Sequence, residues 1–150
     1  MLLHYFRKKE NKEKTKAKEQ YKKIIELSNS ICNQKNIFTK KNYNISFEIV
    51  SIYLILFIRI NLSKKKYKKN IKINDNLMSL FISDLDKSLR EIGIGDMSIG
   101  KYVKSYVKKF YFRISKFPND NNLYKNETFI EYLKITDLIK NDDYVNVSRK

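Results

Sequence analysis

Apolar residues recur at steps of three and four positions along much of the chain, which is the spacing of one face of an α-helix. This pattern predicts a first helix that begins near Lys16 and reaches Cys32. Residues 45–62 are apolar on nearly every side, so they predict a second, central helix. The β-branched content of residues 49–52 would also suit a strand, but the length of the apolar run favours a helix.

Two longer amphipathic patterns follow. Asn74 or Asp75 is expected to cap a third helix, and Asp96 or Ser98 a fourth. The stripe predicted for the third helix consists of Leu77, Leu80, Phe81, Leu85, Leu89 and Ile92. The fourth helix is predicted from Ile99 to Phe117. Its apolar face consists of Ile99, Val103, Tyr106, Val107, Phe110, Ile114 and Phe117. A polar loop at 119–122 then leads to a last helix with Phe129, Ile130, Leu133 and Leu138.

All three glycines of the chain lie between the third and fourth helices, at Gly93, Gly95 and Gly100. Gly93 suits a left-handed C-cap, and the group is expected to form a tight structural hinge between two packed helices. Only one proline, Pro118, is present, and it follows the predicted end of the fourth helix. A chain of 150 residues with so few turn residues predicts an all-α single domain of about five helices.

The same pattern divides the chain into three parts. Residues 1–15 are almost wholly polar after a short apolar start and are expected to form a flexible lead-in. Residues 16–140 form the predicted helical domain, and residues 141–150 a frayed tail.

Charge and cysteine content limit the classes of function. Lys and Arg total 32 against 16 acidic residues, a net charge of +16 that favours nucleic acid, ribosome or anionic-membrane partners. Most of these cations are lysines, so the compositional bias of an AT-rich genome explains the charge equally well. The lysine-rich segment 63–70 is interpreted as a solvated loop rather than a binding patch. A single Cys, Cys32, and a single His, His4, cannot form a structural zinc site, and no metal or other cofactor is predicted.

Membrane insertion and export are not indicated. The uncharged part of the apolar run, Ile49–Ile58, is ten residues long, whereas a spanning helix needs about 20. No transmembrane span is therefore predicted, while peripheral membrane contact stays open. The N-terminal apolar run is too short for a signal peptide, and its charge is on the wrong side.

Residues 95–101 match the spacing of a phosphate-binding loop, G-x-x-x-x-G-K. Tyr102 stands where such a loop needs Ser or Thr, and the preceding segment is a predicted helix rather than a buried strand. Asp84 and Asp86 are two residues apart and point to different sides of that helix, so they do not form a catalytic carboxylate pair. The sequence therefore predicts no enzymatic activity.

An ordered series of short motifs runs through the hinge region. The pieces are Asp84-Leu85-Asp86, Leu89-Arg90-Glu91, Gly93-Ile94-Gly95-Asp96, Gly100-Lys101, Val103-Lys104, Phe110-Tyr111 and Arg113. In this order the series resembles the ubiquinol–cytochrome c chaperone family, helical assembly factors for ubiquinol–cytochrome c reductase. Weaker similarity at Phe47-Glu48 and at residues 56–59 extends the resemblance over roughly residues 17–117. Tyr53 stands where many relatives have His, and the lysine-rich segment after Arg59 and the tail after Phe117 have no clear counterpart.

The resemblance implies a non-enzymatic chaperone that binds cytochrome b or another reductase subunit, with a small partner subunit as a further option. Because no obvious transit peptide precedes the domain, a bacterial cytoplasmic protein is expected, with the inner face of the inner membrane as an option, or the matrix side if eukaryotic. The partner-binding residues expected from it are Asp84, Asp86, Arg90, Asp96, Lys101 and Lys104. The alternative is a basic helical protein that binds RNA or the ribosome, and the two functions can coexist.

Overall fold

The computed structural model describes the backbone of residues 2–34, 42–119 and 127–138, with side chains from residue 12 onwards. In these ranges the chain forms five helices: α1 (Leu2–Cys32), α2 (Tyr43–Ser63), α3 (Tyr67–Glu91), α4 (Asp96–Lys116) and α5 (Glu127–Thr136). The predicted all-α fold of about five helices is confirmed. The tail 141–150, most of the loop 119–122 and the side chain of His4 lie outside the described residues.

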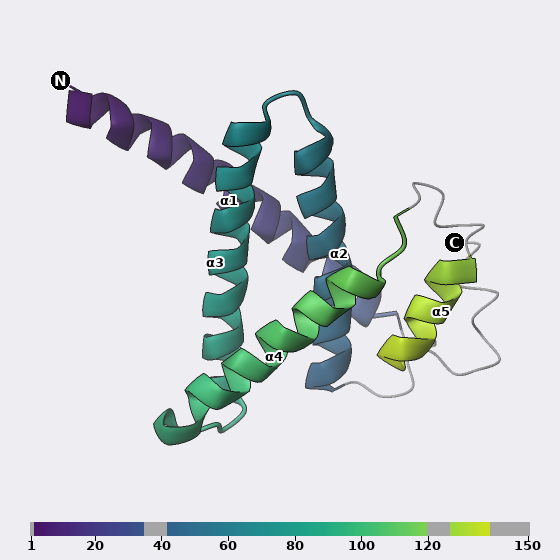
Figure 1. Cartoon of the computed structure of the whole chain (residues 1–150). Helices are drawn as coiled ribbons and strands as arrows, with labels where there is room; N and C mark the ends of the chain where they lie inside the picture. Colours follow the sequence, from purple (N-terminus) through teal and green to yellow (C-terminus); the bar gives the residue numbers. More distant parts are fainter. Residues whose placement is uncertain (1, 35–41, 120–126, 139–150) are drawn as a thin grey trace.

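Helices α2 and α3 form an antiparallel hairpin, and the other helices pack around it (Figure 1). α1 lies behind the hairpin and contacts both of its helices, while α4 crosses the front, mainly against α3. α5 packs beside the first turns of α2, where Leu133 and Leu138 meet Ile45 and Ile49. The turn between α2 and α3 and the turn between α3 and α4 therefore lie at opposite ends of α3.

One hydrophobic core receives side chains from all five helices. Its buried members are Ala17, Ile24, Phe47, Leu54, Ile55, Ile73, Leu77, Phe81, Leu85, Phe110, Phe117 and Tyr132. Aromatic rings connect the hairpin to α4, because Phe81 lies 6.1 Å from Phe47 and 5.0 Å from Phe110 between ring centroids. Offset and edge-on ring contacts of this kind add to the stabilisation from apolar burial.

The central helix α2 begins at a polar cap and is apolar along its length. The side chain of Asn42 accepts a hydrogen bond from the backbone N–H of Ile45 at 3.0 Å, as an N-cap residue does. By length and composition α2 could cross a membrane, since it has 21 residues and contains an 18-residue window with a mean hydropathy of 1.9. It packs against α1, α3 and α4 as a core helix does, and the absence of a span remains a prediction.

Two helix starts differ from those that periodicity predicts. α1 begins at Leu2 rather than near Lys16, because strong helix formers such as Lys, Glu and Ala extend the helix without an apolar stripe. α3 begins at Tyr67, so Asn74 and Asp75 lie inside it and do not cap it. Most of the segment interpreted as a loop, 63–70, is therefore helical, and the turn itself comprises residues 64–66.

Candidate partner-binding surface

The hinge between α3 and α4 is a Schellman-type helix end. Gly93 has φ +104°, a conformation that side-chain-bearing residues rarely adopt. Its N–H donates to the carbonyl of Arg90 at 3.0 Å, and the N–H of Ile94 donates to the carbonyl of Leu89 at 3.1 Å. The predicted left-handed cap at Gly93 is confirmed.

At the other two positions the backbone conformation does not require glycine. Gly95 has an ordinary φ of −78° and serves as the N-cap of α4, while Gly100 lies inside that helix. A Cβ added at either position would meet nothing within 4 Å. Asp96 is the first residue of α4, so the prediction of a cap at Asp96 or Ser98 is wrong. The element before Gly95 is a helix among the described residues, not the strand that precedes a phosphate-binding loop.

Three of the predicted partner-binding residues form one ion cluster across the hinge. Arg90 Nε lies 2.7 Å from Asp86 Oδ1, the predicted i,i+4 pair, and Arg90 Nη1 also pairs with Asp96. These hydrogen bonds to Asp86 and Asp96 raise the pKa of the Arg90 guanidinium. We call Asp86, Arg90 and Asp96 the hinge cluster. It joins the last turn of α3 to the first turn of α4.

The remaining predicted residues lie apart from the hinge cluster. Asp84 faces α1, where its Oδ2 accepts a hydrogen bond from the Tyr21 hydroxyl at 2.6 Å. Burial, followed by the hydrogen bond and charge of Asp84, raises the pKa of Tyr21 well above its usual range. Lys101 and Lys104 are exposed on α4 and form no ion pair with any residue that the structure describes.

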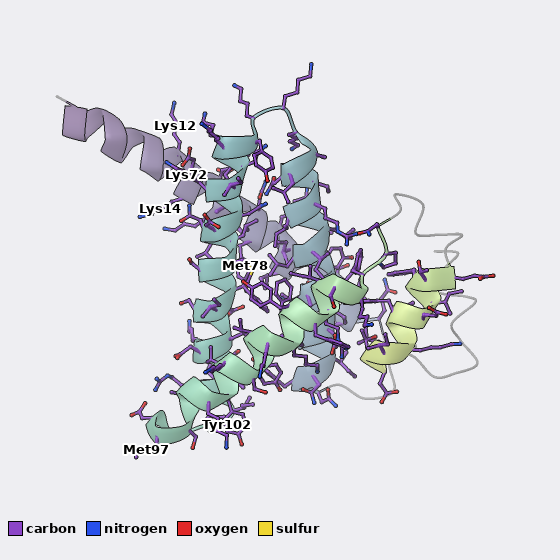
Figure 2. All side chains as sticks on the ribbon, viewed as in Figure 1. Lys12, Lys14, Lys72, Met78, Met97 and Tyr102 are labelled. Atoms are coloured by element: carbon purple, nitrogen blue, oxygen red, sulfur yellow. The ribbon has the colours of Figure 1, made fainter. Side chains whose placement is uncertain are left out.

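Apolar side chains beside the hinge cluster are exposed to solvent. Ile92 is 58% exposed and Met97 is fully exposed at the start of α4 (Figure 2). Ile92 was expected on the buried stripe of α3, but it is the C-cap residue, and the chain has already left the helix there. Tyr102, one turn further along α4, is 45% exposed. Fixed charges next to exposed apolar side chains are typical of a protein-binding surface.

A buried ion pair that periodicity did not predict fastens α4 to α2. Glu48, 2% exposed, accepts hydrogen bonds from Arg113 Nε at 2.9 Å and from Arg113 Nη2 at 2.8 Å. Lys109 Nζ lies 2.9 Å from the same carboxylate. We call these three residues the clamp. A signal for it is present in the sequence, because Glu48 interrupts the apolar run of α2 and Arg113 lies three residues after Phe110, on the apolar side of α4.

The clamp lies at the edge of an open cavity of about 500 Å³ between the start of α2, α4 and the end of α5. Asn44, Ile135 and Asp137 line the other walls of this cavity. Both carboxylate oxygens of Glu48 are already engaged by Arg113 and Lys109, so this carboxylate is not free to bind a ligand in the cavity. The clamp therefore acts as a support for α4.

Arg59 holds the carboxyl end of α4, one turn beyond the clamp and at the end of the helix away from the hinge. Its guanidinium donates to the carbonyls of Phe117, at 3.1 Å, and Pro118, and it lies 4.8 Å from the centroid of the Phe117 ring. Burial lowers the pKa of Arg59 from its ordinary value. A cation at the carboxyl end of a helix satisfies terminal carbonyls and complements the helix dipole.

Residues 39–118 match the family model for the ubiquinol–cytochrome c chaperone. This match spans more than half of the chain. The protein belongs to the ubiquinol–cytochrome c chaperone family. The matched part contains α2, α3 and α4, and with them the clamp and the hinge cluster. α1 lies outside it, so the resemblance is shorter than the expected range of 17–117. No curated protein and no solved structure matches the chain.

Proposed function

We propose that this member of the chaperone family is a non-enzymatic assembly factor that binds cytochrome b, or another subunit, during biogenesis of ubiquinol–cytochrome c reductase. The family match over residues 39–118 carries this proposal. It acts in the bacterial cytoplasm at the inner face of the inner membrane, or on the matrix side in a eukaryote. A small partner subunit completes the complex if the chain alone does not hold the client.

The hinge provides the client-binding surface in this proposal. Ile92 and Met97 supply exposed apolar area, and the hinge cluster beside them supplies charges of both signs. Apolar contacts contribute most of the binding energy at such surfaces, while charged groups at the rim select the partner. Asp84, Lys101 and Lys104 flank the same end of the hairpin and extend the surface along α3 and α4.

The proposal is tested by deletion and capture. In a strain without the gene, the level of assembled reductase should fall, and a tagged copy should restore it and co-purify with cytochrome b. A Met97→Ser, Ile92→Ser variant should lose cytochrome b from the pull-down, because it removes the exposed apolar area that contacts the client. Both residues are exposed, so the fold should be retained. An Ile82→Ser variant, which changes an exposed apolar residue in the middle of α3, is the matched control. Unchanged reductase assembly in the deletion strain would refute the proposal.

Binding to the ribosome is a second candidate, favoured by the outward face of α4. Lys101, Lys104, Lys108 and Lys116 are exposed there together with Tyr102 and Tyr111. Lysines contact phosphates and tyrosines stack on unpaired bases. Co-sedimentation with ribosomes should survive near-physiological salt and weaken when these four lysines become Gln. Complete release at that salt would identify the association as that of a nonspecific polycation.

A further inference from the structure

The turn at the other end of α3 is strongly basic. Seven of the 14 residues from 59 to 72 are Lys or Arg, and none is acidic. Every residue from Leu62 to Lys69 is exposed. Within the described part of the chain, none of the lysines at 64, 65, 66, 68 and 69 forms an ion pair. We call residues 60–69 the lysine turn.

Three large apolar side chains are exposed among these lysines. Ile60 is 49% exposed, Leu62 is 40% exposed and Tyr67 is 59% exposed. They lie at the last turn of α2 and the first turn of α3, which the three residues 64–66 connect. Apolar side chains grouped at a solvent-facing tip are typical of a surface that enters another apolar phase.

Buried amides hold the lysine turn in shape from below. Asn61, 1% exposed, donates to Asn74 Oδ1 at 2.8 Å and exchanges hydrogen bonds with the amide of Gln20 on α1 at 2.9 and 3.0 Å. Asn74 in turn donates to the carbonyl of Ile58 at 3.3 Å. The ends of α2 and α3 are thus tied together and to α1. The turn needs none of its lysines for its own structure.

Further lysines continue the basic surface beyond the turn. Lys12 and Lys14 on α1 and Lys72 on α3 are exposed, and Figure 2 draws all three towards the end of α3 where the lysine turn lies. α1 packs against α3. The positive charge therefore extends over two helices behind the apolar tip.

We propose that the lysine turn docks the protein on the surface of a bilayer that contains anionic phospholipids. Leu62, Ile60 and Tyr67 enter the boundary between headgroups and acyl chains, and the lysines lie at the level of the phosphates. Apolar insertion and electrostatic attraction together give stable attachment where either alone is weak. This inference does not depend on the identity of the client.

The side chains favour a lipid surface over RNA. Ile60 and Leu62 have no flat face on which a base could stack, and the cations of the turn are lysines, which neutralise charge without the paired donors of arginine. The one arginine of the segment, Arg59, is engaged by the carbonyls at the end of α4. A bilayer uses the charge and all three apolar side chains of the turn, whereas RNA would use only the charge and the Tyr67 ring.

Co-sedimentation with vesicles tests the charges. The full chain should bind sucrose-loaded vesicles of phosphatidylcholine and phosphatidylglycerol, mixed two to one, at near-physiological salt, and bind phosphatidylcholine alone much more weakly. Replacing Lys64, Lys65, Lys66 and Lys68 by Gln should weaken binding by roughly fivefold for each lysine near the surface, which is about 600-fold if all four lie there. The control replaces Lys101, Lys104, Lys108 and Lys116 on α4 by Gln, which removes the same charge and should leave binding close to that of the wild type.

A tryptophan reporter tests the insertion. The chain has no tryptophan. In the Tyr67→Trp variant the emission should shift to the blue on the anionic vesicles and be quenched by brominated lipid. Tyr111→Trp is the control, because Tyr111 on α4 is 58% exposed and Tyr67 is 59% exposed. Leu62→Ser should weaken vesicle binding without any change in charge.

Each contrary result overturns the proposal. If the two lysine sets weaken binding equally, net charge alone attracts the protein and the turn has no special role. If Trp at 67 shows no shift on vesicles, or shifts only with poly(U) RNA, the turn does not enter a bilayer. Circular dichroism of each variant shows whether its helices are retained, and loss of binding counts only for variants that retain them.

Discussion

The two ends of α3 both expose large apolar side chains, but they differ in charge. The α3–α4 hinge has Ile92 and Met97 beside a cluster in which two carboxylates engage one guanidinium. The lysine turn has Ile60, Leu62 and Tyr67 among five lysines with no described acidic partner. Residues 84–101 hold four acidic and three basic residues, whereas residues 59–72 hold seven basic and none acidic. Charge balance, rather than apolar exposure, is what distinguishes the two surfaces.

The two turns are also built differently. The hinge depends on one backbone conformation at Gly93 and on side chains that bridge it from outside. The lysine turn depends on the amides of Asn61, Asn74 and Gln20, which lie beneath it. A change to an exposed residue should therefore alter the structure of the hinge more than that of the lysine turn.

The largest effect is expected from removing the clamp, which fixes the placement of α4 and therefore of the hinge. Arg113→Met leaves Glu48 buried without its main partner, and the free energy of unfolding should fall by about 3–5 kcal/mol. Urea unfolding followed by circular dichroism measures this loss. The double variant Glu48→Met, Arg113→Met should recover most of it, since no fully buried charge is then left unpaired and the Lys109 side chain, 34% exposed, reaches solvent. A loss below about 1 kcal/mol in the single variant would contradict a supporting role for the clamp.

The second largest effect is expected at Gly93, whose backbone conformation forms the hinge. Gly93→Ala places a Cβ on a residue with φ +104°, which should cost about 1–3 kcal/mol even though no atom lies within 4 Å of that Cβ. Gly100→Ala is the control, because Gly100 lies inside α4 with open space around it, and it should raise stability by about 0.5–1 kcal/mol. Thermal or urea unfolding measures both. Equal effects at the two positions would show that the hinge conformation carries no strain for other residues.

A smaller effect concerns the contact that ties the hinge end of α3 to α1. The Tyr21 pKa is raised in the folded protein, so the native state keeps this proton above pH 10, where the unfolded state loses it. Its contribution to stability is therefore full below about pH 10 and is lost as the pH rises further. Tyr21→Phe should lower stability by about 1 kcal/mol at neutral pH.

The alkaline loss should also be less steep in Tyr21→Phe. It should persist in part, because burial also raises the pKa of Tyr43, Tyr106 and Tyr132. Urea unfolding at a series of pH values measures the slope. An unchanged slope would show that the Tyr21 hydroxyl does not hold its proton against Asp84.

The smallest effects are expected from exposed charges at the two ends of α3. Arg90→Gln removes an exposed ion pair at each carboxylate of the hinge cluster and should lower stability by less than about 1 kcal/mol. Lys66→Gln removes a lysine from a group of like charges and should leave stability unchanged or slightly raised. Added salt should reduce both differences. A larger loss for Lys66→Gln than for Arg90→Gln would reverse the comparison.

Helical periodicity predicted those features that depend on spacing within a short stretch of sequence. The core faces of α3 and α4, the left-handed glycine and the Asp86–Arg90 pair each depend on residues within one or two helical turns. The start of α3 was missed because Asn70 and Asn74 look like loop or cap residues, yet they are buried inside the helix. Asn74 can lie there because Asn61, on the neighbouring helix, satisfies its amide oxygen.

Contacts between distant parts of the chain were not predictable from spacing. The residues expected to bind a partner were chosen as one group, but the structure brings together only Asp86, Arg90 and Asp96, while Asp84 faces α1. The clamp was missed for the same reason, since helical period places a residue on a face but does not select its partner on another helix. Unusual charges at core positions were the available signal, and at Glu48 and Arg113 they point to each other.

The clamp can form only late in synthesis, because its two main residues are far apart in the sequence. Glu48 and Arg113 are 65 residues apart, so at about 5–20 residues per second the ribosome makes Arg113 about 3–13 seconds after Glu48. During that interval α2, a helix long and apolar enough to cross a membrane, carries a carboxylate whose arginine does not yet exist. The native core closes only after α4 has left the ribosome. The nascent chain thus spends several seconds with an apolar helix that lacks its final contacts.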